Sequence, residues 1–454
     1  MGAFHAYDIR GIYNVDFDKE TAYKVGYFLP GLLGAKEILV GRDCRTSSQE
    51  IHDYLLKGIT DAGADVCDVG LSSTPMVYFG TANYGFKASV QITASHNPAE
   101  YNGMKVSREN ALPVGLDTGL GQIKQWIEEG KPTPPAAVKG KVREKDIHQD
   151  YIDFLMKYKG DYSNLKIAMD CSNGMSSLYV KDIYGSQPSY IFDTLDGRFP
   201  NHEPNPLIPK NVEPLKELVR KTGADVGGIY DGDADRVMFV DEKARFVAPD
   251  LVIALMAYYF CDERGEKAPR VLQEIRSSKA VGEFLADYGA EMHTWRVGRA
   301  FAAPKLREID GLWGGELAGH YYFKDFFYSD SGMLASIIVL RIVSALKKQG
   351  RTLSGEIDKL TRYRNSGEIN FRVEDKKGAM DAVRDFFCAQ ARPDVFMDFD
   401  GYRAEYPDWW FNIRPSNTEP YLRFICEATT DEVLNEKIAQ VQEIIEKRFG
   451  GTRA

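Results

Sequence analysis

A serine hydroxyl at the end of an apolar run is the most informative chemical group in this chain. Residues 88–92 (ASVQI) lead into residues 93–98 (TASHNP), so Ser95 is followed by an imidazole and an amide. Such a run predicts a buried parallel strand that ends in a turn, where open α/β sheets place ligand-handling residues. Ser95 lacks the flanking glycines of a hydrolase nucleophile, whereas His96 and Asn97 can donate hydrogen bonds to phosphate oxygens. The segment therefore predicts a phosphate-handling serine, and a serine that merely caps a turn is the alternative.

Three aspartates alternate with small residues in the segment DGDADR. Asp231, Asp233 and Asp235 would repel one another unless a cation drew them together. Hard carboxylate oxygens favour Mg²⁺ or Ca²⁺. A calcium loop of the EF-hand type needs a glycine at its sixth position, which Arg236 occupies here. The loop predicts a magnesium site with an arginine beside it, and a solvated acidic turn is the alternative.

Two further loops could hold a sugar phosphate. Glu316 and His320 lie in a glycine-rich turn, GGELAGH, whose carboxylate could accept hydrogen bonds from sugar hydroxyls. The segment RPSNTEP begins with Arg414, and a guanidinium fork suits phosphate. The other candidate phosphate contacts of this segment are Ser416, Asn417, Thr418 and, beyond the turn, Arg423. The alternatives are a strand-end turn for the first loop and a polar β-turn for the second.

Two basic residues of the first region could lie beside Ser95. Arg10, in YDIRG, and Lys105, in NGMK, could serve as general acid or base or as phosphate counter-charges. A lysine would need a lowered pKa to act as a base. A solvated surface charge is the alternative for each residue.

The elements that must position these loops alternate between strand and helix patterns. Short apolar runs at 37–41, 64–69 and 88–92 predict strands, and residues 47–62 and 74–84 predict helices, which together favour βαβ units. The pattern restarts near residues 165 and 250, and after about residue 365 it changes to strands beside two helices. We therefore expect three similar α/β domains with mixed, largely parallel sheets (1–146, 147–245 and 246–364) and a C-terminal α+β domain (365–454).

The bulk composition limits the partners and the location. The 454 residues carry a net charge of −9, which does not favour nucleic acid or an anionic membrane as a partner. Six cysteines without a CxxC pair indicate reduced thiols and a cytoplasmic location. The charged N-terminal segment argues against a signal peptide. The most apolar helical stretch, 331–341, reaches an arginine too soon to span a bilayer.

Taken in this order and spacing, the four motifs resemble those of the α-D-phosphohexomutase family. The segments YDIRG (7–11) and GRD (41–43) add to the resemblance, which spans nearly the whole chain and favours the phosphomannomutase/phosphoglucomutase branch. It implies four domains around a central cleft and a phosphoserine at position 95. It also implies Mg²⁺ beside that phosphoserine, with Ser95, Asp231, Asp233 and Asp235 as ligands.

The resemblance also implies roles for the remaining residues. Those expected to transfer protons or contact the reacting phosphate are Arg10, His96 and Lys105. Those expected to bind the substrate are Arg236, Gly298, Glu316, His320, Arg414, Ser416, Asn417, Thr418 and Arg423. Two positions depart from the family pattern: Ala318 replaces a usual serine, which removes a hydrogen bond worth about 1 kcal/mol, and Arg299 replaces a frequent histidine and is expected to add a phosphate contact.

The expected function is a phosphohexomutase that interconverts hexose 6-phosphate and hexose 1-phosphate of mannose, glucose or both. Phosphorylated Ser95 would transfer its phosphoryl group to the sugar and give a hexose 1,6-bisphosphate, while the last domain closes as a lid. The expected partners are hexose phosphates, without nucleic acid or membrane, and the chain is expected as a monomer or small homo-oligomer. The alternatives are a phosphoglucosamine mutase and a catalytically silent sugar-phosphate-binding protein.

Overall fold

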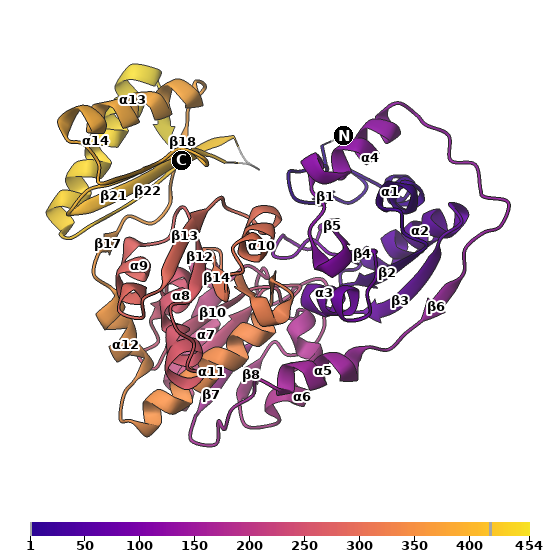
Figure 1. The fold of residues 1–454 in the computed structure, drawn as a ribbon, viewed down its shortest axis with the longest axis horizontal. Coiled ribbons are helices and arrows are strands. Elements are labelled where there is room, and N and C mark those ends of the chain that lie inside the picture. Colours follow the sequence, from indigo (N-terminus) through magenta and orange to yellow (C-terminus); the bar gives the residue numbers. More distant parts are fainter. Residues whose placement is uncertain (1, 417–419) are drawn as a thin grey trace.

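The computed structural model describes residues 2–416 and 420–454, and it contains four β-sheets with helices packed against them (Figure 1). The first sheet has the strand order β1-β5-β4-β2-β3-β6. Its strands are β1 (Ile9–Ile12), β2 (Glu37–Arg42), β3 (Asp65–Leu71), β4 (Ala88–Ile92), β5 (Tyr101–Arg108) and β6 (Val142–Glu144). Its helices are α1 (Lys19–Leu33), α2 (Ser48–Asp61), α3 (Thr74–Asn83) and α4 (Leu120–Glu128).

The strand directions of the first sheet confirm the predicted βαβ pattern and add two strands to it. The neighbours β4, β2, β3 and β6 run parallel, as expected for strands joined by helices. Strands β5 and β1, which the apolar runs did not predict, pair antiparallel beside β4. They bring Lys105 and Arg10 to the same side of the sheet as the serine turn, because β5 returns directly alongside the strand that precedes Ser95.

The second sheet carries the triple-aspartate loop. Its order is β11-β10-β9-β7-β8, and the loop joins the antiparallel strands β9 and β10. The strands are β7 (Ile167–Asp170), β8 (Ser189–Ile191), β9 (Val226–Tyr230), β10 (Val237–Asp241) and β11 (Phe246–Val247). The helices are α5 (His148–Met156), α6 (Val180–Tyr184) and α7 (Pro209–Thr222). All five residues of β9 and of β10 are buried, so the loop between them is held by buried strands at both ends.

The third sheet carries the glycine-rich turn between β14 and β15. Its order is β13-β12-β14-β15-β16. The strands are β12 (Arg270–Glu274), β13 (Glu291–Trp295), β14 (Trp313–Gly315), β15 (Tyr321–Phe323) and β16 (Ser329–Asp330). The helices are α8 (Pro249–Leu255), a π-helical turn (Tyr258–Glu263), α9 (Lys279–Ala286), α10 (Arg299–Glu308), α11 (Gly332–Lys348) and α12 (Leu353–Leu360).

The fourth sheet is antiparallel, which confirms the α+β character of the C-terminal part. Its order is β19-β20-β21-β22-β18-β23, and β17 pairs with β22. The strands are β17 (Arg364–Asn365), β18 (Ile369–Arg372), β19 (Val395–Met397), β20 (Tyr402–Glu405), β21 (Trp409–Pro415), β22 (Tyr421–Ala428) and β23 (Thr452–Arg453). Helices α13 (Lys376–Gln390) and α14 (Asp431–Phe449) cover it. Short 3₁₀ turns elsewhere are Glu109–Ala111, Leu116–Thr118, Met175–Leu178 and Lys324–Phe326.

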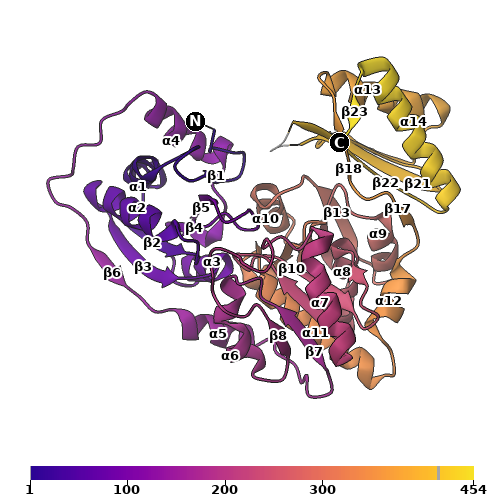
Figure 2. The same cartoon turned by 180° about the vertical axis from the view of Figure 1, so that it is seen from behind.

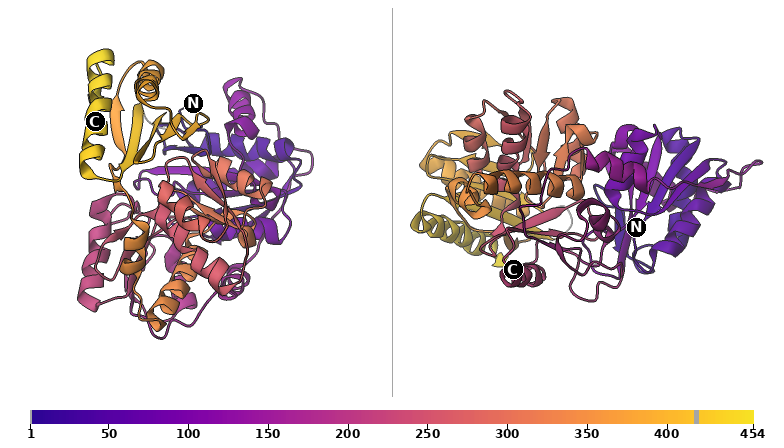
Figure 3. Two further views of the ribbon diagram at one scale, coloured as in Figure 1. Left: turned by 60° about the vertical axis from the view of Figure 1, so that its left-hand side comes forward. Right: turned by 90° about the horizontal axis from the view of Figure 1, so that it is seen from below.

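The four units form an arc with the first and the fourth at its two ends (Figures 1 and 2). One continuous buried core includes Met76 of the first unit, Ile167 of the second and Trp313 of the third. The fourth unit has a separate core around Phe411 and Val441. Seen from below, the fourth and first units lie on opposite sides of the middle of the molecule (Figure 3, right). Because the fourth unit does not share the common core, it can move with less disruption of packing than the others.

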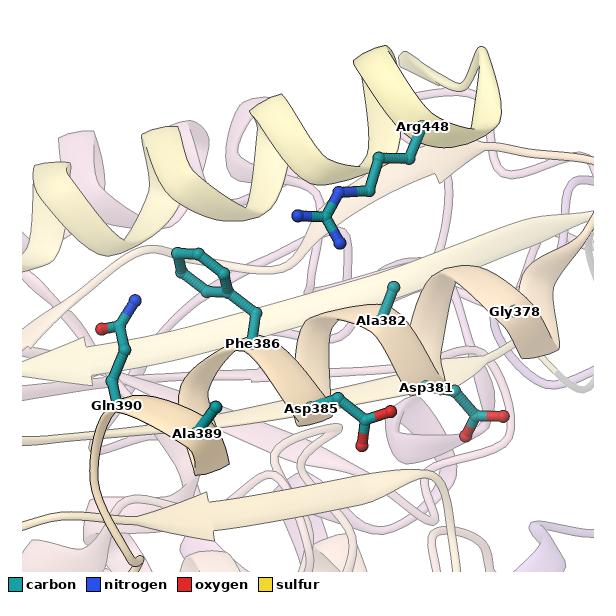
Figure 4. A pocket seen from close by; sticks show the side chains of 8 residues that line it. All are labelled: Gly378, Asp381, Ala382, Asp385, Phe386, Ala389, Gln390 and Arg448. Carbon is teal, nitrogen blue, oxygen red and sulfur yellow. The ribbon is translucent and has the colours of Figure 1, made fainter.

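Among the described helices, none is long and apolar enough to cross a membrane. An open pocket of about 660 Å³ lies on the fourth unit between α13 and the end of α14, where the side chains of Phe386 and Arg448 point toward one another (Figure 4). None of the residues predicted for the active site lines this pocket.

Candidate active site

The serine loop and the triple-aspartate loop meet at one hydrogen bond. The Ser95 hydroxyl donates to Oδ2 of Asp231 at 2.8 Å, although the two residues come from different sheets. Ser95 is 1% exposed and has a left-handed backbone (φ 52°), and its N–H donates to Oγ1 of Thr93 at 2.9 Å. The strained turn is therefore braced from within, and it aims the hydroxyl at the acidic loop.

The three aspartates form a cluster whose chemistry fits a hard divalent cation. All three side chains are fully buried, and one oxygen of each lies within 4.8 Å of the others. The Oδ1 atoms of Asp233 and Asp235 have no hydrogen-bond partner among the described residues. Burial, followed by the negative charges of Asp235 and Asp233, raises the pKa of Asp231 well above its usual value. Buried, unpartnered carboxylate oxygens of this kind are the ligands that Mg²⁺ prefers.

Lys105 lies between two of the aspartates as a counter-charge. Its Nζ donates to Oδ2 of Asp233 at 2.7 Å and to Oδ2 of Asp235 at 2.6 Å. Burial by itself lowers the pKa of this ammonium, but the two carboxylates outweigh burial and raise the pKa above the usual lysine value. A lysine that acts as a general base needs the opposite shift, so this environment suits Lys105 to charge neutralisation.

The other predicted basic residues lie against the serine loop and the triple-aspartate loop. Nδ1 of His96 lies 3.3 Å from the Ser95 Oγ, and Nη1 of Arg10 donates to Oδ1 of Asn97 at 2.9 Å. Nε of Arg236 lies 3.7 Å from Oδ2 of Asp231. Burial, and then the positive charges of Arg236 and Arg10, lower the pKa of His96 well below its usual value, which keeps the ring neutral. The structure thus brings every predicted residue of the first two loops together.

Two residues of this site were missed by the sequence reasoning. The Arg45 guanidinium, 2% exposed, donates to the carbonyl oxygens of Ser95 (2.9 Å), Asn97 (2.6 Å) and Pro98 (2.6 Å). The Thr74 hydroxyl donates to Oδ2 of Asp233. Arg45 follows the GRD motif by two residues, so the motif was a signal for it, whereas nothing in the sequence near Thr74 indicated an acidic partner.

The glycine-rich loop that contains Glu316 and His320 is called the sugar loop below. It lies directly beside the triple-aspartate loop. An isolated antiparallel bridge joins His320 to Arg236, and the N–H of Val237 donates to the carbonyl oxygen of Gly319 at 3.3 Å. Within the loop, the N–H of Glu316 donates to the carbonyl oxygen of His320 at 2.9 Å. Burial, in spite of the nearby imidazole, raises the pKa of Glu316. A carboxylate and an imidazole thus lie together next to the serine loop and the triple-aspartate loop.

Arg299 lies between the first and third units. Its Nε donates to Oδ1 of Asp330 at 2.9 Å, its Nη2 donates to the carbonyl oxygen of Ala111 at 2.7 Å, and its guanidinium lies 3.7 Å from the ring centroid of Tyr78. The Arg299 guanidinium therefore joins the first unit, through Ala111 and Tyr78, to the third unit, through Asp330. These contacts make Arg299 a cation that joins two units, and the phosphate contact expected of it stays a prediction.

Gly298 and its neighbour connect three of the units. The backbone of Gly298 has φ 109°, and a Cβ there would come 3.0 Å from the ring of Tyr7. The Tyr7 hydroxyl donates to the carbonyl oxygen of Val297 at 3.2 Å, and the N–H of Val297 donates to Oδ2 of Asp400 at 2.9 Å. This glycine loop therefore lies where the first, third and fourth units meet.

The predicted phosphate loop is placed differently from the other three. Arg414, near the end of β21, is 3% exposed, and its Nε donates to Oδ1 of Asp400 at 3.3 Å. Nη1 of Arg423 lies 3.1 Å from Oε1 of Glu368, and the N–H of Ser416 donates to the carbonyl oxygen of Tyr421 at 2.9 Å. Asn417 and Thr418 lie outside the described residues. In this structure both arginines face carboxylates, and none of the contacts described here joins them to the serine loop.

Comparison with known proteins agrees with this geometry. Family models for phosphoglucomutase/phosphomannomutase match four successive parts of the chain: α/β/α domain I at residues 1–133, domain II at 149–244, domain III at 248–363 and the C-terminal domain at 368–444. The chain belongs to the phosphoglucomutase/phosphomannomutase family. The predicted family, the α/β fold class and the predicted class of enzyme, a phosphohexomutase, are thereby confirmed.

Individual relatives match over nearly the full length. The chain is 34% identical over 460 residues to a phosphomannomutase of Escherichia coli, covering 98% of both sequences. It is 33% identical over 453 residues to a phosphomannomutase of Methanocaldococcus jannaschii, covering 98% of this chain and 97% of the relative. A crystal structure of a phosphoglucomutase/phosphomannomutase family protein from Burkholderia thailandensis superposes with a TM-score of 0.88 at 26% identity, covering 100% of this chain and 99% of that one.

Proposed function

We propose that this phosphohexomutase interconverts the 6-phosphates and 1-phosphates of mannose, glucose or both through phosphorylated Ser95 and a hexose 1,6-bisphosphate. The observation that carries the proposal is the Ser95 hydroxyl, 2.8 Å from a buried carboxylate of a three-aspartate cluster. A phosphoryl group on that oxygen carries about −1.5 to −2 charges. It would stand among cations of the first two loops and would displace the hydrogen bond to Asp231.

In the proposed transfer, a free sugar hydroxyl attacks the phosphorus atom of phosphorylated Ser95. The new P–O bond forms to the sugar oxygen and the sugar hydroxyl proton leaves to a base. The bond to the Ser95 Oγ breaks, and this leaving oxygen takes up a proton and becomes the serine hydroxyl again. The residues that would hold Mg²⁺ are Ser95, Asp231, Asp233 and Asp235, and the ion would neutralise charge on the phosphoryl oxygens. Lys105 and Arg10 add fixed positive charge, so that catalysis depends on position and neutralisation.

Return of the second phosphoryl group requires the bisphosphate to present its other end to Ser95. The sugar must therefore be held by contacts that fit both orientations, for which Glu316 and His320 are suited as hydrogen-bond partners of hydroxyl groups. The fourth unit has its own core, and its Arg414 and Arg423 are paired with carboxylates in this structure. We propose that the unit closes over the sugar phosphate and that the phosphate takes over these arginines.

A substrate panel on the wild type and on Ser95→Ala tests the proposal. Mannose 1-phosphate, glucose 1-phosphate and glucosamine 6-phosphate are assayed in coupled reactions with Mg²⁺ and a trace of hexose 1,6-bisphosphate. We expect the wild type to convert mannose 1-phosphate and glucose 1-phosphate. We expect the activity of Ser95→Ala to be at least about 1,000-fold lower, because the variant lacks the oxygen atom that accepts the phosphoryl group. Preference for the glucosamine substrate would instead favour a phosphoglucosamine mutase.

Intact mass distinguishes the enzyme from a silent binding protein. Incubation with a hexose 1,6-bisphosphate is expected to add one phosphate to the wild type and none to Ser95→Ala. A wild-type chain that stays unphosphorylated and inactive under these conditions would contradict the proposal. A cytoplasmic location belongs to the same proposal, and its support is that all six cysteines are free thiols in the structure.

A further inference from the structure

The glycine-rich sugar loop is followed by a short strand pair whose register places two polar side chains opposite each other. Strands β15 and β16 are antiparallel, and Tyr322 pairs directly with Asp330. Both residues are fully buried. A buried hydroxyl and a buried carboxylate need partners, and each of these two finds its partner in the sugar loop.

The tyrosine holds the carboxylate of the loop. The Tyr322 hydroxyl donates to Oε1 of Glu316 at 2.7 Å. Glu316 is 2% exposed, and no other described residue forms a hydrogen bond with its carboxylate. The aromatic ring of Tyr322 also stacks beside that of His320, with centroids 6.3 Å apart and planes inclined by 27°. One side chain therefore restricts the position of both loop residues.

The aspartate holds the imidazole. Oδ2 of Asp330 lies 2.6 Å from Nδ1 of His320, so that nitrogen must carry the proton and Nε2 is the atom left for a ligand. The other oxygen, Oδ1, accepts from Nε of Arg299 at 2.9 Å. Arg299 is itself anchored on the first unit through Ala111, so the aspartate can turn away from the histidine only by breaking its bond to a guanidinium that is held in place.

From this geometry we propose that Tyr322 and Asp330 are positioning residues: Tyr322 orients the Glu316 carboxylate, and Asp330 selects the Nδ1–H tautomer of His320. Both residues act through the two side chains that would contact the sugar and not through contact of their own. The inference rests on the proposed function, since the orientation of Glu316 and His320 matters for catalysis only if the substrate is a hexose phosphate. It goes further by assigning the orientation of the two sugar-binding side chains to a pair of strand residues.

The tautomer is tested by nitrogen NMR on full-length protein labelled with ¹⁵N-histidine, without substrate, with the His320 signals assigned by His320→Gln. In the wild type we expect a protonated Nδ1. In Asp330→Asn the side-chain oxygen stays with Arg299 and the amide NH₂ faces Nδ1, which must then accept, so the proton is expected on Nε2. An unchanged tautomer in Asp330→Asn overturns the assignment. This measurement does not depend on activity, so it tests the tautomer even if the wild type is inactive. A wild type that is inactive on every hexose phosphate would contradict the proposed function and not the tautomer.

The tyrosine is tested separately by Tyr322→Phe, which keeps the ring and removes the hydroxyl. We expect kcat/KM for glucose and mannose phosphates to fall about tenfold, to an unequal extent for the two sugars. The rate at which phosphorylated Ser95 loses its phosphate to water in the absence of sugar is expected to stay at the wild-type value. A merely structural role would change both rates or neither.

The neighbouring Tyr321 supplies a matched control. It is also fully buried, but its hydroxyl donates to the carbonyl oxygen of Pro249 at 3.1 Å. Tyr321→Phe therefore loses one buried hydrogen bond without touching the sugar loop, and its kcat/KM is expected to stay within about twofold of the wild type. Equal losses in Tyr321→Phe and Tyr322→Phe, or wild-type kcat/KM and wild-type sugar preference in Tyr322→Phe, would overturn the proposal.

Discussion

The backbone of Gly232 lies against the carbonyl oxygen of Ser95, and a Cβ at position 232 would come 2.4 Å from that oxygen. Only a residue without a side chain lets the acidic loop approach the serine turn closely enough for the hydrogen bond between Ser95 and Asp231. The distance between the Ser95 hydroxyl and the triple-aspartate loop is thus set by a glycine that has no side chain to offer to a ligand.

Gly232→Ala is expected to separate the two loops and to lower kcat/KM about 100-fold, since misplacement of about 1 Å can have that effect. The control is Gly228→Ala in β9, where the nearest atom to an added Cβ is 4.0 Å away on Val237. Steady-state kinetics and thermal unfolding of both variants check the prediction. Similar activity in the two variants would show that the close approach does not matter.

The buried aspartates predict that Mg²⁺ stabilises the fold. An ion that binds only the folded chain adds about 2.7 kcal/mol when its concentration is 100 times the dissociation constant. Asp231→Asn is expected to raise the stability of the metal-free protein, because it removes one of three mutually repelling buried charges, and to abolish most of the gain from Mg²⁺. Thermal unfolding with Mg²⁺ and with a chelator measures both effects, and an equal Mg²⁺ gain in wild type and variant would refute the metal assignment.

Arg45 is expected to be essential for the shape of the serine turn. Lysine cannot reproduce a planar guanidinium that reaches several carbonyl oxygens at once. Arg45→Lys should therefore lower the free energy of unfolding by about 3 kcal/mol, because buried carbonyl oxygens of the turn lose their donors at about 1–3 kcal/mol each, and should lower activity. Arg198→Lys is the control, because the exposed Arg198 pairs with Asp196 at the surface and with no other acidic residue of the described part of the chain. Denaturant unfolding of both variants makes the comparison, and equal small effects would contradict the prediction.

The buried pair of His202 and Asp170 predicts a pH dependence of stability. Nε2 of His202 lies 3.1 Å from Oδ2 of Asp170, and Nδ1 lies 2.8 Å from the carbonyl oxygen of Glu203, so both ring nitrogens face acceptors. Burial by itself lowers the pKa of His202, but the hydrogen bond and charge of Asp170 outweigh burial and raise the pKa above the usual value. The folded chain therefore binds more protons just above the usual histidine pKa than the unfolded chain does. This contribution to stability is complete below that pKa and is lost as pH rises through the raised one.

His202→Gln measures that contribution. The difference in unfolding free energy between wild type and variant is expected to be on the order of 1 kcal/mol larger at pH 6 than at pH 8.5. Denaturant unfolding at the two pH values gives this difference directly. A difference that is independent of pH, or larger at pH 8.5, would mean that the imidazole is not charged in the fold.

Ala318 predicts a change in sugar preference. It is half-buried in the loop between Glu316 and His320, where the family usually has a serine. Ala318→Ser adds a hydroxyl that can bond to a substrate oxygen, and we expect the ratio of kcat/KM for mannose and glucose phosphates to change up to about tenfold while kcat changes little. Coupled assays with both sugars decide, and an unchanged ratio would contradict the expectation.

The order of chemistry along the chain was readable from local residue types. This holds for four places: the serine after an apolar strand (Ser95), the alternating aspartates, the glycine-rich loop with Glu316, and Arg414. At each place the chemical role follows from the residue type and a few neighbouring residues. The βαβ pattern of the first unit also followed from apolar runs, because burial of a parallel strand requires them. These features are local, so the sequence by itself determined them.

Only the tertiary structure decided how these groups combine. Strands β5 and β1 lacked a clear apolar signal, so the sequence did not show that they carry Lys105 and Arg10 to the serine turn. The sequence also could not show that Arg299 is used to join units, that Arg414 faces Asp400, or that Tyr322 and Asp330 stand opposite each other. Each of these is a pairing between residues that depends on how sheets and units pack, and the energy that selects it comes from burial and charge contacts between distant segments.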